Sequence, residues 1–335
     1  MTHLDNWAQT VPVIFMGLMG LAMFVYVVLD GFDLGIGILL PRADEAQKDR
    51  MVASIGPFWD ANETWLVLGV GILLIAFPKA HGMVLTALYL PAAWMLIGLI
   101  LRGVAFDFRV KAPGHHKPLW NAAFFAGSLM ASLAQGWMLG RYITGFAPGW
   151  LYTAFAATIA LALPAVYVLL GATWLVMKTE GALQERAIGW ARRAWGPVVL
   201  GMVLISVATP WVSLTVRERW FSMPQFIGLM PIPLATAALL IALRWTLGLP
   251  RTRADLCWLP FVLNIGVMVM GAFGLAYSLY PYVVMDRITL WQAASATESL
   301  NVILIGCVIT VPAIAAYSAF SYWVFRGKAT ALHYG

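Results

Sequence analysis

The chain has 335 residues, of which 61% are hydrophobic and only 11% are charged, and its mean hydropathy is +0.82. A water-soluble fold cannot bury so much apolar surface, so the composition excludes a soluble globular protein and indicates an integral membrane protein. The formal charge of +6 comes from basic residues scattered singly through short loops, which favours lipid headgroups over nucleic acid as their partners.

Nine apolar runs are long enough to cross a bilayer, which requires roughly 20 residues. They predict an all-α fold, a polytopic transmembrane helical bundle that forms a single integral membrane domain over residues 1–335. Because the loops between consecutive spans are short, we expect two four-helix bundles and one peripheral helix. The predicted spans are residues 12–40, 52–78, 82–101, 120–140, 150–177, 196–215, 226–246, 259–280 and 299–324.

The distribution of basic residues predicts how the chain is oriented in the membrane. Sixteen of the 21 Lys and Arg residues fall in the loops that follow odd-numbered spans and in the C-terminal tail. Lys and Arg concentrate on the cytoplasmic side of membrane proteins. The N-terminus is therefore expected outside and the C-terminus in the cytoplasm.

The first span carries two acidic residues near its predicted cytoplasmic end. Asp30 and Asp33 are three residues apart and so share one helix face. Gly31 and Gly35 form a small-xxx-small spacing, which lets another helix approach closely. The segment can be a packing motif with two interfacial carboxylates or part of a proton site, and the pattern alone favours neither.

The second span is the most polar, and it contains Asp60 and Glu63 on one face. Asp60 is predicted about nine residues into the helix from the cytoplasmic side, or about 13 Å at 1.5 Å per residue. A carboxyl group in a low-dielectric site favours its neutral form and can take up and release a proton near neutral pH. The pattern predicts a proton relay supported by Trp59, Asn62 and Trp65. The alternative is a carboxyl group held neutral or paired to fix helix packing.

A third group, Arg102, Asp107 and Arg109, follows the third predicted span on the same side of the membrane. The two arginines could pair with the acidic residues. An ordinary positive-inside loop with a local ion pair is the favoured interpretation over a direct catalytic role.

No histidine lies inside a predicted span, although membrane-embedded b-type haems are usually held by histidines that project from helices. We therefore expect no haem and no metal site within this chain. A proton-coupled secondary transporter would also place acidic residues inside a helical bundle, so it is the main alternative function. A third possibility is a scaffold whose acidic residues only pack against a partner.

The sequence resembles subunit II of the cytochrome bd-type quinol oxidases, and more closely their cyanide-insensitive branch, over nearly its whole length. Four separated stretches in the same order carry the resemblance. They are residues 30–37 (DGFDLGIG), residues 57–65 (PFWDANETW), residues 102–109 (RGVAFDFR) and the region from Tyr280 to Leu300.

The resemblance implies a heterodimeric respiratory oxidase of the bacterial plasma (inner) membrane that oxidises quinol and reduces dioxygen to water. The haem-bearing subunit I, with haems b and d or b only, would hold the main quinol site, and small single-helix accessory subunits would complete the complex. Subunit II, not catalytic alone, would stabilise the complex, contribute a cytoplasmic proton path and in some members hold a structural ubiquinone.

Individual residues match the motifs of that family. Asp60 matches its buried proton-path aspartate, and Asp30 and Asp33 match the acids of its first helix. Position 63 is Glu here, where some relatives carry Gln. If Glu63 titrates, it is expected to share a proton with Asp60, because two close carboxyl groups seldom ionise together.

Overall fold

The computed structural model describes residues 3–329, which form a long helical bundle with one small hairpin. The elements are α1 (His3–Leu39), η1 (Leu40–Arg42), α2 (Glu45–Ala53), α3 (Trp59–Ala76), α4 (Pro78–Lys111), η2 (Gly114–His116), α5 (Lys117–Ile143), α6 (Trp150–Lys178), α7 (Gly181–Val212), α8 (Leu214–Phe221), α9 (Gln225–Leu229), α10 (Pro231–Thr246), η3 (Pro250–Arg253), α11 (Leu259–Leu279), β1 (Tyr282–Val284), β2 (Ile288–Thr289), α12 (Leu290–Ala293) and α13 (Thr297–Val324). Strands β1 and β2 pair antiparallel, with Tyr282 opposite Thr289.

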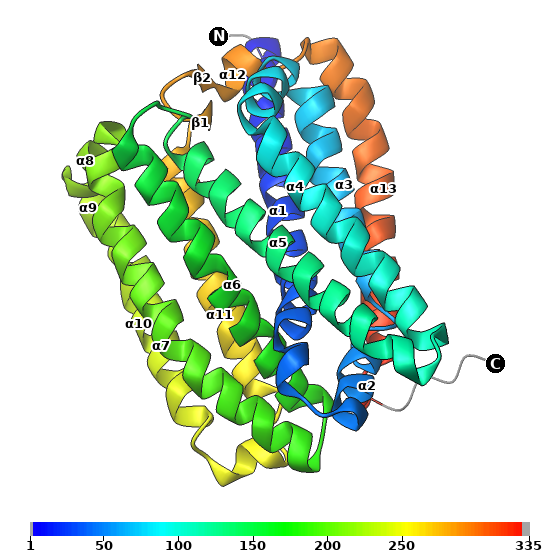
Figure 1. The fold of residues 1–335 in the computed structure, drawn as a ribbon. Coiled ribbons are helices and arrows are strands. Elements are labelled where there is room, and N and C mark those ends of the chain that lie inside the picture. Colours follow the sequence, from blue (N-terminus) through cyan, green and yellow to red (C-terminus); the bar gives the residue numbers. More distant parts are fainter. Residues whose placement is uncertain (1–2, 330–335) are drawn as a thin grey trace.

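Nine helical segments within residues 3–329 are long and apolar enough to cross a membrane, which confirms the predicted number of spans. Helices α1, α3, α4 and α5 form one group. In the second group, α6 packs against both α7 and α11, and α11 packs against α10. Helix α13 lies at the edge beside α3 (Figure 1). Most of its residues are exposed, and its buried residues are Leu300, Cys307, Ser318 and Ser321. This arrangement confirms the expected pair of four-helix groups with one peripheral helix.

The second span is shorter than predicted, because the chain forms two helices there rather than one. Helix α2 ends at Ala53, five residues of turn follow, and α3 starts only at Trp59. Pro57 has no backbone N–H and disfavours helical geometry at Gly56, which itself has a low helix propensity. The turn therefore moves the start of the spanning helix from residue 52 to residue 59.

The two helix groups meet where α1 crosses α6 at very short range. A Cβ atom built on Gly35 would overlap the carbonyl group of Tyr167, and one on Gly171 would lie 2.7 Å from the backbone nitrogen of Ile36. Next to this crossing, the Phe32 ring stacks on Trp174 with 4.2 Å between the ring centroids. The small residues predicted to allow close approach thus position α1, and with it Asp30 and Asp33, against the second group.

Replacing Gly35 by alanine is expected to lower the free energy of unfolding by about 1–3 kcal/mol, because the added methyl group forces the two backbones apart. Gly20→Ala is the matched control, since a Cβ on Gly20 meets nothing within 4 Å. Thermal unfolding of the purified protein in detergent measures both. Equal melting temperatures for Gly35→Ala and Gly20→Ala would show that the crossing is not tightly packed.

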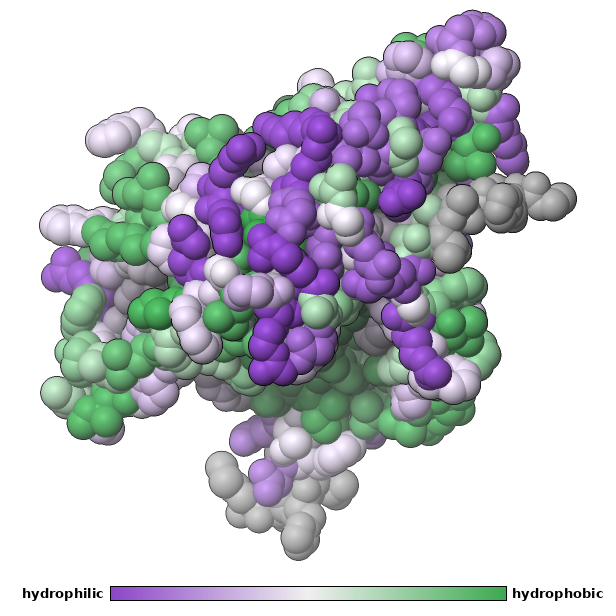
Figure 2. All heavy atoms as spheres, turned by 90° about the horizontal axis from the view of Figure 1, so that it is seen from below, coloured by the Kyte–Doolittle hydropathy of each residue, from purple (hydrophilic) through white to green (hydrophobic). Residues whose placement is uncertain are grey.

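One end of the bundle is distinctly hydrophilic. We call it the basic end, and it comprises residues 40–58, 109–120, 178–195 and 247–258. Viewed along the bundle from this end, hydrophilic residues extend from the middle to the upper right, and hydrophobic residues lie mainly at the left and below (Figure 2). Helix α2 lies on this end, and its Asp44 side chain accepts a hydrogen bond from the backbone of Gln47 at 2.9 Å. The basic end is the part of the molecule suited to the aqueous boundary of a membrane.

Candidate functional site

The centre of the candidate site is a buried arginine that pairs with two carboxyl groups. Arg102 of α4 contacts Asp30 of α1, with 2.5 Å between Nη1 and Oδ1, and its Nη2 pairs with Glu63 of α3. The side chains of Asp30 and Arg102 are only 1% and 2% exposed, whereas Glu63 is 30% exposed. Three helices therefore converge on one guanidinium, and Glu63 is the member of this group that reaches the surface.

The burial of Arg102 contradicts the favoured expectation of an ordinary loop. Helix α4 continues to Lys111, ten residues beyond the predicted end of the third span at residue 101. Arg102 thus lies about nine residues, or about 13 Å, inside the basic end of its helix. Arginine does not interrupt a helix, and here its charge is compensated by the carboxylates of neighbouring helices.

Asp33 forms a second branch of the site through α3 and α13. Its Oδ2 accepts a hydrogen bond from Asn62 Nδ2 at 2.8 Å, and Asn62 Oδ1 accepts one from the Tyr322 hydroxyl at 2.9 Å. Asp33 is fully buried and Asn62 is 1% exposed. The otherwise peripheral helix α13 therefore reaches the acidic cluster through a single tyrosine.

Asp60 does not lie deep in a span, and this part of the prediction is wrong. Because α3 begins at Trp59, Asp60 falls in the first helical turn, and its side chain is exposed. It remains one turn from Glu63 on the same side of α3. The buried carboxyl groups are Asp30 and Asp33 instead.

A narrow void lies beside Asp33 and is too constricted to admit a water molecule. Trp59 forms one of its walls and packs against Phe106 at 5.2 Å between ring centroids. Within the described part of the chain, Asp33 Oδ1 and Arg102 Nε have no hydrogen-bond partner.

The remaining residues singled out in the sequence lie outside the cluster. Arg109 is buried, but it pairs with Asp49 of α2 at 2.8 Å and donates to Asn121 of α5. Asp107 is exposed. Trp65 is buried and donates a hydrogen bond to Ser318 of α13 at 3.4 Å. Arg109 and Trp65 thus fasten α2 and α13 to the bundle, and Asp107 touches none of the buried acidic residues.

Sequence reasoning missed a polar chain on the other side of Asp30. The Tyr167 hydroxyl donates to Gln135 Oε1 at 2.5 Å, and Gln135 Nε2 donates to the Tyr26 hydroxyl at 2.7 Å. Tyr26 lies one turn before Asp30, whose Oδ2 accepts no hydrogen bond from residues 3–329. The signals that could have revealed the chain are the i, i+4 spacing of Tyr26 and Asp30 and a glutamine inside the fourth span.

The electrostatics of the cluster restrict its charge. Asp30 and Glu63 pair with Arg102, and Asp33 lines the same void as that arginine, so full ionisation would leave a net charge of about −2 in a low-dielectric interior, which is strongly unfavourable. Within this group the two aspartates are buried, and Glu63 is the member that is partly exposed.

The described residues do not fit a bound haem or quinone at this site. His81, His115 and His116 are not buried, so they present no facing imidazoles in the bundle interior. Between residues 3 and 329 no three His, Cys, Asp or Glu side chains are grouped as metal ligands. The void beside Asp33 is too narrow for a quinone ring.

Comparisons with known proteins match nearly the whole chain. Residues 11–325 match the profile of the family described as cytochrome bd terminal oxidase subunit II. The chain is 28% identical to cytochrome bd ubiquinol oxidase subunit 2 of Bacillus subtilis, with 97% of this chain and 96% of that protein covered. It is 26% identical to cytochrome bd-I ubiquinol oxidase subunit 2 of Escherichia coli K12, with 93% of each covered.

The fold is similar to a solved structure as well. The bd oxidase from Geobacillus thermodenitrificans contains a chain that matches with a TM-score of 0.75 and 19% sequence identity, covering 94% of this chain and 99% of that chain. This similarity confirms the helical architecture.

Proposed function

Because this chain belongs to the cytochrome bd terminal oxidase subunit II family and is a subunit of a cytochrome bd ubiquinol oxidase complex, we propose that it conducts protons to the haem-bearing subunit I. The observation that carries the proposal is the buried Arg102, which pairs with Asp30 and Glu63 and lines the same void as a third carboxyl group, that of Asp33. Family membership favours this function over a proton-coupled transporter.

The path starts at the basic end. Positively charged loops favour the cytoplasm, so protons would come from inside the cell, with the N-terminus outside. Asp60 is exposed one turn before Glu63 and can collect protons for it. Glu63 then passes a proton into the cluster, where Arg102 holds Glu63 and Asp30 on either side of one guanidinium.

The destination of these protons is the reduction of dioxygen in subunit I, with quinol as the electron donor. The partner would cover a membrane-facing side of α3 and α4, so that the proton passes between subunits without crossing lipid. Protons taken up from the cytoplasm and consumed in the partner move charge across part of the membrane. The reaction then contributes to the membrane potential without a separate pump.

Asp33→Asn tests whether the cluster carries protons or only packs the helices. The amide keeps an acceptor for Asn62 but cannot take up a proton, so the complex should assemble with full haem content and reduce oxygen several-fold more slowly. Oxygen consumption per haem in the purified complex measures this. Asp107→Asn is the control, because Asp107 is exposed and lies outside the cluster. Normal turnover of a fully assembled Asp33→Asn complex would favour the scaffold function.

A further inference from the structure

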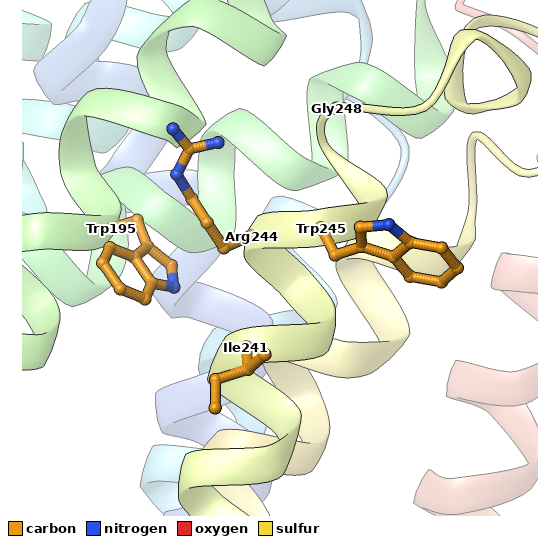
Figure 3. A pocket seen from close by; sticks show the side chains of 5 residues that line it. All are labelled: Trp195, Ile241, Arg244, Trp245 and Gly248. Carbon is orange, nitrogen blue, oxygen red and sulfur yellow. The ribbon is translucent and has the colours of Figure 1, made fainter.

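A groove of about 450 Å³ lies at the basic end between α7 and α10, away from the acidic cluster. Trp195, Ile241, Arg244, Trp245 and Gly248 line it. Figure 3 shows the Arg244 side chain pointing up from α10, with the Trp195 ring on one side of it and the Trp245 ring directed to the other side. The volume of the groove is in the range of ligand sites in proteins.

Among residues 3–329, no carboxylate compensates the charge of Arg244. Three other arginines of the basic end have partners: Arg192 donates to the carbonyl of Leu247 at 2.6 Å, Arg251 pairs with Asp255 and Arg253 pairs with Glu185. The exposed Arg244 has no carboxylate of the described residues within 4.0 Å and donates no hydrogen bond to any of them. A positive charge in an otherwise apolar groove is complementary to an anion.

The walls of the groove are suited to a lipid. Tryptophan rings favour the headgroup level of a bilayer. The orientation of Trp195 is fixed, since its indole N–H donates to the carbonyl of Leu240 at 2.9 Å. Ile241 lies about one turn deeper than Arg244 and extends the groove toward the hydrocarbon region. The site thus has a cationic end at the boundary and an apolar end inside the membrane.

The groove also lies where lipid is expected. Helices α7 and α10 form the edge of the molecule opposite α13, and α3 and α4 carry the face that we assign to subunit I (Figure 1). We propose that the groove binds an anionic phospholipid, with the headgroup phosphate on the Arg244 guanidinium and an acyl chain along Ile241. A neutral quinone would leave the arginine charge uncompensated.

Native mass spectrometry of the purified complex in detergent, supplied with phosphatidylglycerol, tests this proposal. Arg244→Gln should retain about fivefold less phosphatidylglycerol than the wild type, as expected when one basic residue near the membrane surface is lost. Arg244→Lys should retain most of it. Arg50→Gln, which removes an exposed arginine from α2 at the same end of the bundle, should bind like the wild type.

Three outcomes would overturn the proposal. Equal phosphatidylglycerol retention by Arg244→Gln and wild type would show that Arg244 binds no headgroup. Equal retention of phosphatidylcholine and phosphatidylglycerol by the wild type would show that the site does not select anionic lipid. Displacement of phosphatidylglycerol by inorganic phosphate alone would identify a phosphate site without an acyl-chain contribution. The test measures lipid binding and not oxygen reduction, so its result does not depend on whether the proposed proton path is correct.

Discussion

Arg102→Gln is expected to destabilise the complex by about 3–5 kcal/mol, because it leaves two carboxyl groups without their buried counter-charge. Glutamine cannot replace either ion pair, and Asp30 is too deeply buried to be solvated. The yield of haem-containing complex should fall sharply, and the melting temperature of the remainder should drop. Size-exclusion chromatography with haem quantitation measures the first, and a thermal unfolding scan measures the second.

Two further variants show whether charge is the cause. Adding Asp30→Asn to Arg102→Gln removes the buried carboxylate that had paired with Arg102, so this double variant should recover a large part of the lost stability. Arg50→Gln removes an exposed arginine and should behave like the wild type. A wild-type yield and melting temperature for Arg102→Gln would contradict the described cluster.

Glu63→Gln is expected to slow oxygen reduction by roughly tenfold or more while haem content stays unchanged. The amide keeps the size of the side chain and can still accept a hydrogen bond from Arg102, but it cannot carry a proton. Steady-state oxygen consumption with a soluble quinol measures the rate, normalised to haem.

Asp60→Asn is the informative comparison for Glu63→Gln, because Asp60 is exposed one turn away on the same helix. Water can reach the partly exposed Glu63 directly, so loss of Asp60 should slow turnover less than loss of Glu63. Equal oxygen-reduction rates in Glu63→Gln and wild type would contradict a role of Glu63 in proton transfer. A larger effect at Asp60 than at Glu63 would move the essential group to the surface.

Hydropathy predicted most of the nine spans because they are nearly uninterrupted apolar runs, and such a run is a local property of the sequence. The second span is more polar than the others, at a mean hydropathy of 1.2. Hydropathy could not place the first turn of α3, because Gly56 and Pro57 end the preceding helix within a segment of similar hydropathy. The predicted depth of Asp60 was wrong for this reason alone. Asp30 and Arg102 occupy about the depth that had been assigned to Asp60.

The sequence predicted the acidic residues of the candidate site but not the residues with which they pair. The pairs that define it join residues far apart in the sequence: Arg102 with Asp30, and Asn62 with Tyr322. No periodicity within one helix encodes such contacts. The acidic residues could be found because a charged side chain inside a membrane span is energetically costly and therefore marks a candidate functional site. Tyr322 gives no comparable signal, since tyrosine is common in transmembrane helices.

The most direct test of the central claim is proton uptake itself, measured during a single turnover of the complex in proteoliposomes with a pH-sensitive dye on the side of the basic end. In wild type, protons should disappear from that side at the rate at which oxygen is reduced. In the Glu63→Gln, Asp33→Asn double variant, proton uptake from that side should lag by tenfold or more. Proton uptake at the wild-type rate by a fully haem-loaded double variant would contradict a path through this subunit.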